Sequence, residues 1–126
     1  MKKTISLSVF AVASALVLSA SAMAGDAANG EKIFKKKCKT CHVVEAGKKP
    51  KATGPNLAGF LTRPSGTSDY KHSKKLAAAA ITWNEETLDQ WLQNPRKMVK
   101  GSRMSFKLKK EKDRQDVIAY LMTIGS

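Results

Sequence analysis

Apolar side chains recur three and four positions apart in three stretches of the chain, which is the spacing of one face of an α-helix. The first predicted helix covers about residues 29–37, with lysines on its other face. The second begins near Thr82, because Thr82-x-x-Glu85 is a capping-box pattern, and it ends at Asn94-Pro95. The third has acidic residues at its head, which suit the positive end of a helix. The residues that define the three helices are Gly30, Ile33, Phe34, Lys37 and Cys38, then Leu88, Trp91 and Leu92, then Glu111, Asp113, Asp116, Val117, Tyr120, Leu121 and Ile124.

The segment between the first two helices, residues 43–73, is rich in helix-breaking residues. Its glycines and prolines exclude a long helix, and it has no alternating strand pattern. About 30 residues without regular structure are unusual in a compact domain, so the segment is either disordered or packed against something other than protein. The same holds for residues 95–106, whereas the alanine-rich stretch 74–80 predicts a short fourth helix. The breakers are Pro50, Gly54, Pro55, Gly59, Pro64 and Gly66.

The N-terminal segment has the pattern of a secretory signal peptide. A positive start, an apolar run and a final Ala-x-Ala are followed by a polar turn, which predicts cleavage after Ala24. The alternative is an uncleaved membrane anchor, since the apolar run is nearly long enough to span a bilayer. We expect residues 1–24 to be removed, which leaves a single domain of residues 25–126. The expected location is the bacterial periplasm, an oxidising compartment.

The chain is strongly basic, with 23 Lys and Arg against 10 Asp and Glu. Loss of Lys2 and Lys3 with the leader lowers the formal net charge from +13 to +11. Such a charge implies an anionic partner, which means an acidic protein surface, nucleic acid or anionic lipid. Export argues against nucleic acid. After the leader no apolar stretch is long enough to span a membrane, so an integral membrane protein is not expected.

Residues 38–42, Cys-Lys-Thr-Cys-His, form a C-x-x-C-H motif. The two thiols of such a motif can each add across a vinyl group of one haem, and the following histidine is then held under the iron as an axial ligand. A disulfide or a thioredoxin-type pair is the alternative, but the latter belongs in a βαβ unit. A closed zinc site would need more ligands than His72, the other histidine, can supply. The motif therefore predicts one haem c, attached through Cys38 and Cys41 and bound by His42. This haem would give the irregular segments an apolar group to wrap.

The group on the other side of the iron decides between an electron carrier and a ligand-binding haem protein. A histidine–methionine iron is closed and favours electron transfer, whereas an open sixth position favours ligand binding or peroxide chemistry. Met122 lies on the last predicted helix, where a methionine fills the core. Met98 and Met104 both lie on the loop after Pro95, and spacing does not choose between them.

The residues around the motif are typical of one family. Nearly all of the chain after the leader resembles the class I cytochromes c, which include mitochondrial cytochrome c and its soluble bacterial relatives. The resemblance implies an all-α cytochrome c fold, with three main helices and long loops wrapped round one covalently bound haem. The matching features are Gly30 and Phe34 before the motif, the strings 53–57 and 81–95, the loop 101–106 with Met104, and the string 114–121.

The resemblance also implies roles for individual residues. The Pro55 carbonyl would accept the ring N–H of His42, which fixes the ring and raises its basicity. Met104 would be the sixth ligand of the iron. Arg63 and Trp83 would donate to a haem propionate. Taken without the resemblance, Arg63 would be a solvated loop residue and Trp83 a core aromatic.

The chain departs from the family's pattern at two places. The family usually has proline before the glycine of the methionine loop, and here the residue is Lys100, so one φ restraint is missing. The family's propionate-binding tyrosine falls on His72. Either His72 takes that role, or Tyr70 shifts into it, or His72 is an exposed loop residue. Trp91 is expected to pack only in the core.

These features predict a soluble periplasmic carrier of single electrons that is monomeric and has no catalytic residues. Its expected partners are acidic surfaces of redox proteins: an oxidase, a quinol–cytochrome oxidoreductase, a dehydrogenase or a reaction centre. Lysines beside the motif and the methionine loop would steer docking, whereas Lys109, Lys110 and Lys112 would be solvated. The alternative is a haem-c gas sensor or peroxidase-like protein with a labile sixth ligand.

Overall fold

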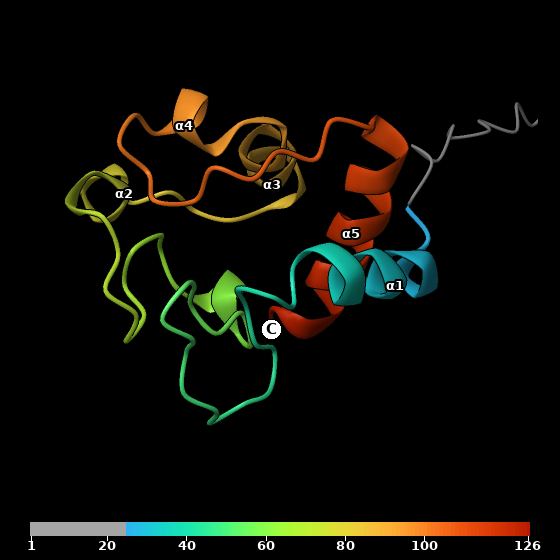
Figure 1. Ribbon diagram of the computed structural model, residues 1–126, viewed down its shortest axis with the longest axis horizontal. Coiled ribbons are helices and arrows are strands. Elements are labelled where there is room, and N and C mark those ends of the chain that lie inside the picture. Colours follow the sequence, from blue (N-terminus) through green and yellow to red (C-terminus); the bar gives the residue numbers. More distant parts are fainter. Residues whose placement is uncertain (1–24) are drawn as a thin grey trace, which may run out of the picture.

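The computed structural model describes residues 25–126, so the predicted signal peptide, residues 1–24, lies outside the described residues. Helices joined by long loops make up this part of the chain (Figure 1), and the predicted all-α class is confirmed. Between residues 25 and 126, strand-like pairing is limited to two isolated bridges. No helix of this part is long and apolar enough to cross a membrane. The helices are α1 (Ala27–Lys37), the 3₁₀ turn η1 (Phe60–Thr62), α2 (Lys74–Ala79), α3 (Glu85–Gln93), α4 (Pro95–Met98) and α5 (Glu111–Ile124).

Two helix starts differ from the predictions because of their capping residues. α1 begins earlier than predicted, since the Asp26 side chain accepts the backbone N–H of Asn29 and so caps the helix. The predicted Thr82 cap of α3 is wrong. Asn84 caps α3, because its side chain accepts the backbone N–H of Thr87. The Thr87 hydroxyl oxygen in turn accepts the backbone N–H of Asn84. The capping box is therefore formed by Asn84 and Thr87 instead of the predicted Thr82 and Glu85.

The loop after α3 is less irregular than predicted. Pro95 ends α3 but also begins the four-residue helix α4, where proline at the first position loses no hydrogen bond. Asn94 lies between the two helices, ending α3 and capping α4 through its side chain to the N–H of Lys97. The remainder of the loop, as far as α5, contains no helix.

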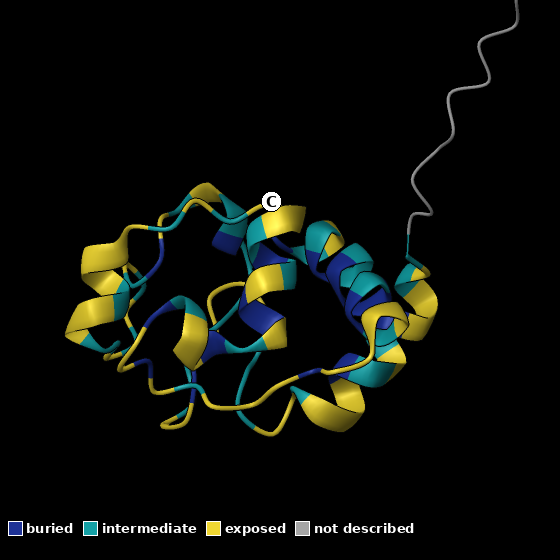
Figure 2. Cartoon of the chain, turned by 90° about the horizontal axis from the view of Figure 1, so that it is seen from above, coloured by how far each residue is buried: buried dark blue, intermediate teal, exposed yellow. Residues whose placement is uncertain are grey.

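The core forms where α1, α3 and α5 pack together. α1 crosses α5 (Figure 1), and the Phe34 and Tyr120 rings meet at this crossing with centroids 5.4 Å apart. The helices α1, α3 and α5 carry both buried and exposed positions, as their periodicity predicted, whereas α2 has no buried residue (Figure 2). The buried apolar residues are Phe34, Phe60, Leu88, Trp91, Leu92, Val99, Leu108, Val117, Ile118 and Leu121.

The long middle segment is ordered by backbone hydrogen bonds to distant residues. Gly59 N–H donates to the Ile124 carbonyl and Leu61 N–H to the Gly125 carbonyl, which attaches the segment to the end of α5. Further along, Ser65 N–H donates to the Ile81 carbonyl. These bonds satisfy backbone groups that have no helix or sheet partner, so the segment forms one side of the molecule.

A buried carboxylate, Asp116, joins the start of α1 to α5. It accepts the Asp26 backbone N–H at 2.7 Å and the Asn29 side-chain N–H at 2.8 Å, and it pairs with the Lys112 ammonium. Lys112 is therefore not merely solvated, as the sequence suggested. Burial by itself raises the pKa of Asp116, but the bonds from Lys112, Asn29 and Asp26 together outweigh it and lower the pKa below its ordinary value.

Replacing Asp116 by asparagine is expected to lower the free energy of unfolding by about 2 kcal/mol at neutral pH, since a charged acceptor is lost. Because the folded pKa is depressed, this stabilisation is present above the unfolded pKa and is lost as pH falls through the folded value. Wild type and variant should therefore converge in acid. Denaturant titrations at a series of pH values measure this, and a constant difference at all pH values would contradict it.

Candidate cofactor-binding site

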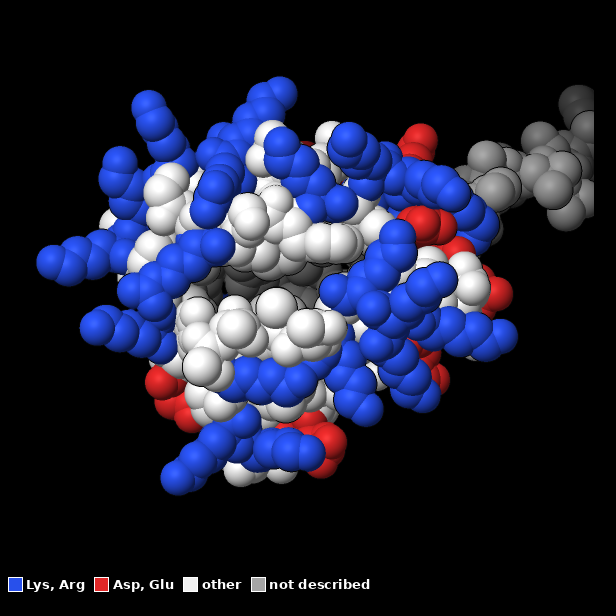
Figure 3. Space-filling model, in the orientation of Figure 1, with Lys and Arg blue, Asp and Glu red and all other residues white. Residues whose placement is uncertain are grey.

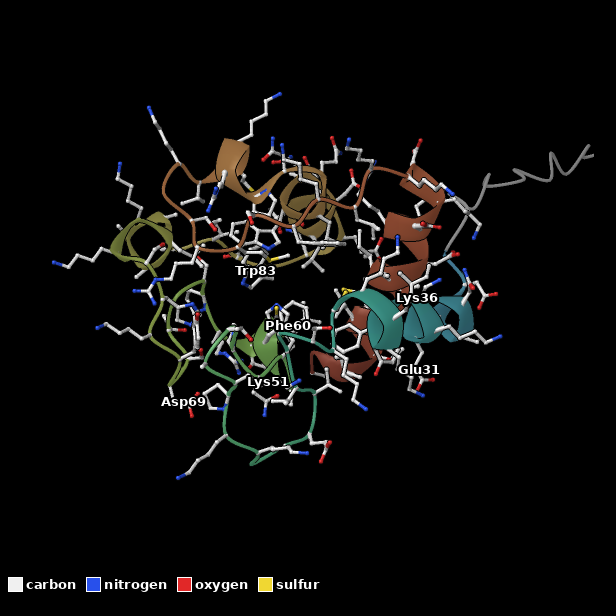
Figure 4. All side chains as sticks on the ribbon, viewed as in Figure 1. Glu31, Lys36, Lys51, Phe60, Asp69 and Trp83 are labelled. Atoms are coloured by element: carbon white, nitrogen blue, oxygen red, sulfur yellow. The ribbon has the colours of Figure 1, made fainter. Side chains whose placement is uncertain are left out.

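The helices and the middle segment enclose a cavity of about 610 Å³. Figure 3 shows an uncharged, hollowed centre on this face, with lysine and arginine side chains around it. Phe60 of η1 and Trp83, just before α3, extend into the space between their backbones (Figure 4). The volume lies within the range of about 300–1,000 Å³ that small-molecule and cofactor sites occupy. The apolar lining residues include Phe34, Leu57, Phe60, Leu76, Leu88, Leu92, Val117 and Leu121.

The cysteines and histidine of the motif line this cavity. Cys38 ends α1, and the backbone N–H groups of Cys41 and His42 both donate to its carbonyl at 3.0 Å. This turn brings all three side chains to one wall. Both cysteines are free thiols and partly buried. Burial raises the pKa of the Cys38 thiol to about 11. Among the described residues, no three His, Cys, Asp or Glu side chains are grouped so that they could hold a metal ion by themselves.

The ring of His42 is held by the middle segment. Its Nδ1 lies 2.9 Å from the Pro55 carbonyl oxygen. A carbonyl only accepts, so Nδ1 carries the proton and Nε2 keeps its lone pair. Burial lowers the pKa of His42 despite the Pro55 bond, which favours the neutral imidazole that binds metals. Gly54 permits this approach, because a Cβ there would lie 2.6 Å from the Cys41 carbonyl oxygen and 2.9 Å from the His42 ring.

Of the three methionines in residues 25–126, Met104 lines the cavity, and Met98 and Met122 do not. Met98 and Met122 are partly buried against the core. The Met104 loop begins with a turn in which Ser102 N–H donates to the Val99 carbonyl, and Gly101 has a φ of 92°. A residue in this left-handed region at the third position of a turn is normally glycine.

The two predicted propionate donors lie on the cavity wall in different settings. Arg63 is partly buried, and its guanidinium donates to the carbonyls of Asn56 at 2.7 Å and Ala58 at 3.1 Å. It is therefore not a solvated loop arginine. The Trp83 ring packs edge-on against Trp91 with centroids 5.4 Å apart, and its indole N–H has no hydrogen-bond partner within residues 25–126.

The sequence missed part of the wall. Trp91 is buried in the core, but it also lines the cavity, so the expectation that it packs only in the core is wrong. His72 and Tyr70, the two residues that the sequence offered for the propionate-binding position, both line the cavity, and His72 is partly buried rather than an exposed loop residue. The Nε2 atom of His72 lies 2.6 Å from the Ser68 hydroxyl oxygen, a contact that no spacing rule would have revealed.

The lining of the cavity fits a haem. Thiols in C-x-x-C-H order, a histidine with a free Nε2 and mostly apolar walls are the groups that covalent haem attachment needs. Apart from the motif itself, most polar lining residues come from residues 63–73 and 102–105, with Lys37, Thr40 and Thr53 elsewhere, which suits a flat apolar ring with carboxylates. The fold and the site thus define a small all-α protein with a covalently bound haem c.

Comparison with known proteins identifies the family. The family model described as cytochrome c matches residues 27–125. Cytochrome c of Chlamydomonas reinhardtii is 52% identical over 104 residues, covering 81% of this chain and 92% of that protein. Cytochromes c of Theileria parva and Guizotia abyssinica are 45% and 47% identical, each covering 81% of this chain and 89% and 93% of their own lengths. The chain belongs to the cytochrome c family, whose members are electron-transfer proteins, and its haem c is attached through Cys38 and Cys41.

Proposed function

We propose that this cytochrome c is a soluble periplasmic carrier of single electrons whose iron is bound on both sides, by His42 and Met104. The observation that carries the proposal is that the cavity wall contains, besides His42 with its free Nε2, only one of the three methionines of residues 25–126. When bound, the haem supplies a one-electron change between ferric and ferrous iron. A site closed by two protein ligands leaves no position for a substrate, which favours electron transfer over ligand binding.

The chain's own residues would bind, orient and shield the cofactor. Pro55 fixes the ring of His42 through its carbonyl and keeps Nε2 available. The buried walls from α1, α3 and α5 exclude water, which together with ligand identity tunes the potential. At the polar end, we assign the indole N–H of Trp83 and the positive charge of Arg63 to the haem carboxylates. Arg63 already donates to two carbonyls, so it would act mainly by its charge.

An optical spectrum of the purified holoprotein tests this proposal. A carrier with two protein ligands should give a low-spin ferric spectrum and should not bind carbon monoxide when reduced. It should also be reduced and reoxidised reversibly by one electron. A high-spin ferric spectrum, or rapid binding of carbon monoxide, would favour the alternative of a gas sensor or peroxidase-like protein. Neither result affects the family assignment.

Export and the domain boundary belong to the same proposal. Residues 1–24 have the charge, apolar run and small terminal residues of a signal peptide, and family similarity begins at residue 27. Expression of the full chain in a bacterium that attaches haem c should give a monomeric periplasmic protein that begins at Gly25. Intact mass, N-terminal sequencing and size-exclusion chromatography measure this. A membrane-bound protein that retains residue 1 would contradict export by cleavage.

The basic surface supports docking to acidic redox proteins. Lys37 lines the cavity, Lys97 and Lys100 are exposed near the methionine loop, and Figure 3 shows basic side chains around the hollow. The rate of electron transfer to a negatively charged redox protein should fall by about tenfold or more once salt brings the Debye length below about 10 Å. The rate with a small neutral oxidant should change little.

Charge reversal locates the docking face. Lys37→Glu, Lys97→Glu or Lys100→Glu should slow the reaction more than Lys109→Glu, because Lys109 is exposed in the segment that leads into α5, where its carbonyl accepts the Arg114 guanidinium. Lys112 is unsuitable as the control, since it binds the buried Asp116. Equal slowing by all four reversals would mean that net charge acts without a defined face.

A further inference from the structure

The polar end of the cavity contains a histidine, the side-chain type whose ordinary pKa lies near neutrality. His72 is partly buried on the loop before α2, and its ring lies on the cavity wall. The chain has two histidines, and His42 is assigned to the iron. His72 is therefore the histidine left free to exchange a proton with solvent between about pH 5 and 8.

The contacts of His72 suit both of its protonation states. Its Nε2 lies 2.6 Å from the Ser68 hydroxyl oxygen. A hydroxyl both donates and accepts. Ser68 can therefore donate to Nε2 of the neutral ring and accept from the N–H of the charged ring without moving. The Tyr70 ring meets the imidazole edge-on at 5.1 Å, and the His72 backbone N–H donates to the Tyr70 carbonyl, so the ring is held in place.

The charges that face His72 come from three segments. Burial, and then the positive charges of Arg63 and Arg103, lower the pKa of His72, while Asp69 on its own loop opposes them. Asp69 lies at the outer edge of that loop (Figure 4). Arg103 is held close because its guanidinium donates to the Lys71 carbonyl at 2.8 Å. Haem carboxylates at this end would favour the charged ring and so oppose this lowering of the His72 pKa.

We propose that His72 is a redox-linked proton site, which binds a proton more tightly in the ferrous than in the ferric protein. The inference rests on the proposed electron-carrier function. Reduction adds one negative charge to the haem, and His72 shares the cavity with it, so the electron and the proton attract each other. Between the two titration midpoints, reduction takes up one electron at the iron and a fraction of one proton from solvent at the His72 ring. A tyrosine at this position would not titrate in this range.

The size of the effect follows from linkage. At an effective dielectric constant of about 20, one charge added about 17 Å away changes proton affinity by about fivefold. Since a tenfold change in a one-electron equilibrium is 59 mV, the midpoint potential should fall by about 40 mV in all as pH rises through the His72 titration. The potential is higher on the acid side, because the positive ring favours the added electron.

Two measurements on the holoprotein test the proposal. The midpoint potential is recorded from about pH 5 to 8, and the His72 ring resonances are followed by NMR in both oxidation states. The potential should fall over the range in which His72 titrates, with a higher titration midpoint in the ferrous protein. His72→Gln and His72→Tyr should make the potential flat over the same range. A flat potential in the wild type, or a slope that survives in His72→Gln, would overturn the proposal.

Ser68→Ala separates a proton site from a merely structural role. The variant removes a partner from both protonation states, but the bond from the charged ring is the stronger one. The slope should therefore move to lower pH without disappearing, whereas a packing role would leave the pH profile in place. The matched control is Thr67→Ala, since Thr67 lines the same cavity but its hydroxyl donates to the Pro64 carbonyl. If the pH at which the potential falls shifts equally in Ser68→Ala and Thr67→Ala, the proposed hydrogen-bonding role of Ser68 is wrong. A high-spin spectrum would instead show that the carrier function fails.

Discussion

Replacing Met104 by leucine is expected to lower the midpoint potential by on the order of 100 mV or more, since axial ligands set haem potentials over about 0.8 V. A thioether raises the potential, and leucine has a similar volume but no donor atom. The weak far-red charge-transfer band of methionine-bound ferric haem should disappear. Both effects are read from a spectroelectrochemical titration of the holoprotein.

The matched control is Met98→Leu. Met98 is partly buried at the end of α4 but does not line the cavity, so its loss should leave the band and the potential unchanged. If the band persists in Met104→Leu and vanishes in Met98→Leu, the ligand is Met98 and the loop must differ in the holoprotein. If the wild type lacks the band at neutral pH, the site is not closed by methionine.

The second large effect is expected at the crossing of α1 and α5. A Cβ on Gly30 would lie 1.9 Å from the Asp116 carbonyl oxygen, and backbone cannot rotate away as a side chain can. Helix propensity alone would make Gly30→Ala stabilising by up to about 1 kcal/mol. The clash should outweigh that gain, because overpacking of this kind costs about 3 kcal/mol. The net result should be a clear loss in the free energy of unfolding.

Denaturant unfolding of the holoprotein measures this loss as a fall in the midpoint with an unchanged slope. Lys32→Ala is the control on the same helix, since Lys32 is exposed and its replacement should change stability by about 0.5 kcal/mol or less. A Gly30→Ala variant at least as stable as wild type would mean that the two helices lie farther apart than described.

Local patterns in the sequence were sufficient to predict the helices and the haem attachment. α1, α3 and α5 were found from apolar spacing, because a helix face depends on residues only three and four positions apart. The C-x-x-C-H motif is equally local, since one turn after α1 brings Cys38, Cys41 and His42 to the same wall.

Helix ends were predicted less well, because several nearby residues compete to cap the same helix. Both Thr82 and Asn84 precede α3, and either residue type can cap a helix. Asn84 does so because Thr87 completes the box, while the Thr82 carbonyl accepts the Thr87 hydroxyl. The sequence pattern predicts Pro95 only as the end of α3, although proline is also a favourable first residue of a new helix.

The sequence by itself determined the all-α class, the three main helices and the residues that attach the haem, since each of these depends on neighbours within one or two helical turns. Spacing left Met98 and Met104 open, the resemblance to the family favoured Met104, and the tertiary structure places Met104 on the cavity wall. It also joined Asp116 to Asp26, ninety positions away, and gathered Arg63, His72 and Arg103 at one end of the cavity. Contacts between residues so distant in sequence depend on how the loops close around the core, and no local spacing encodes that closure.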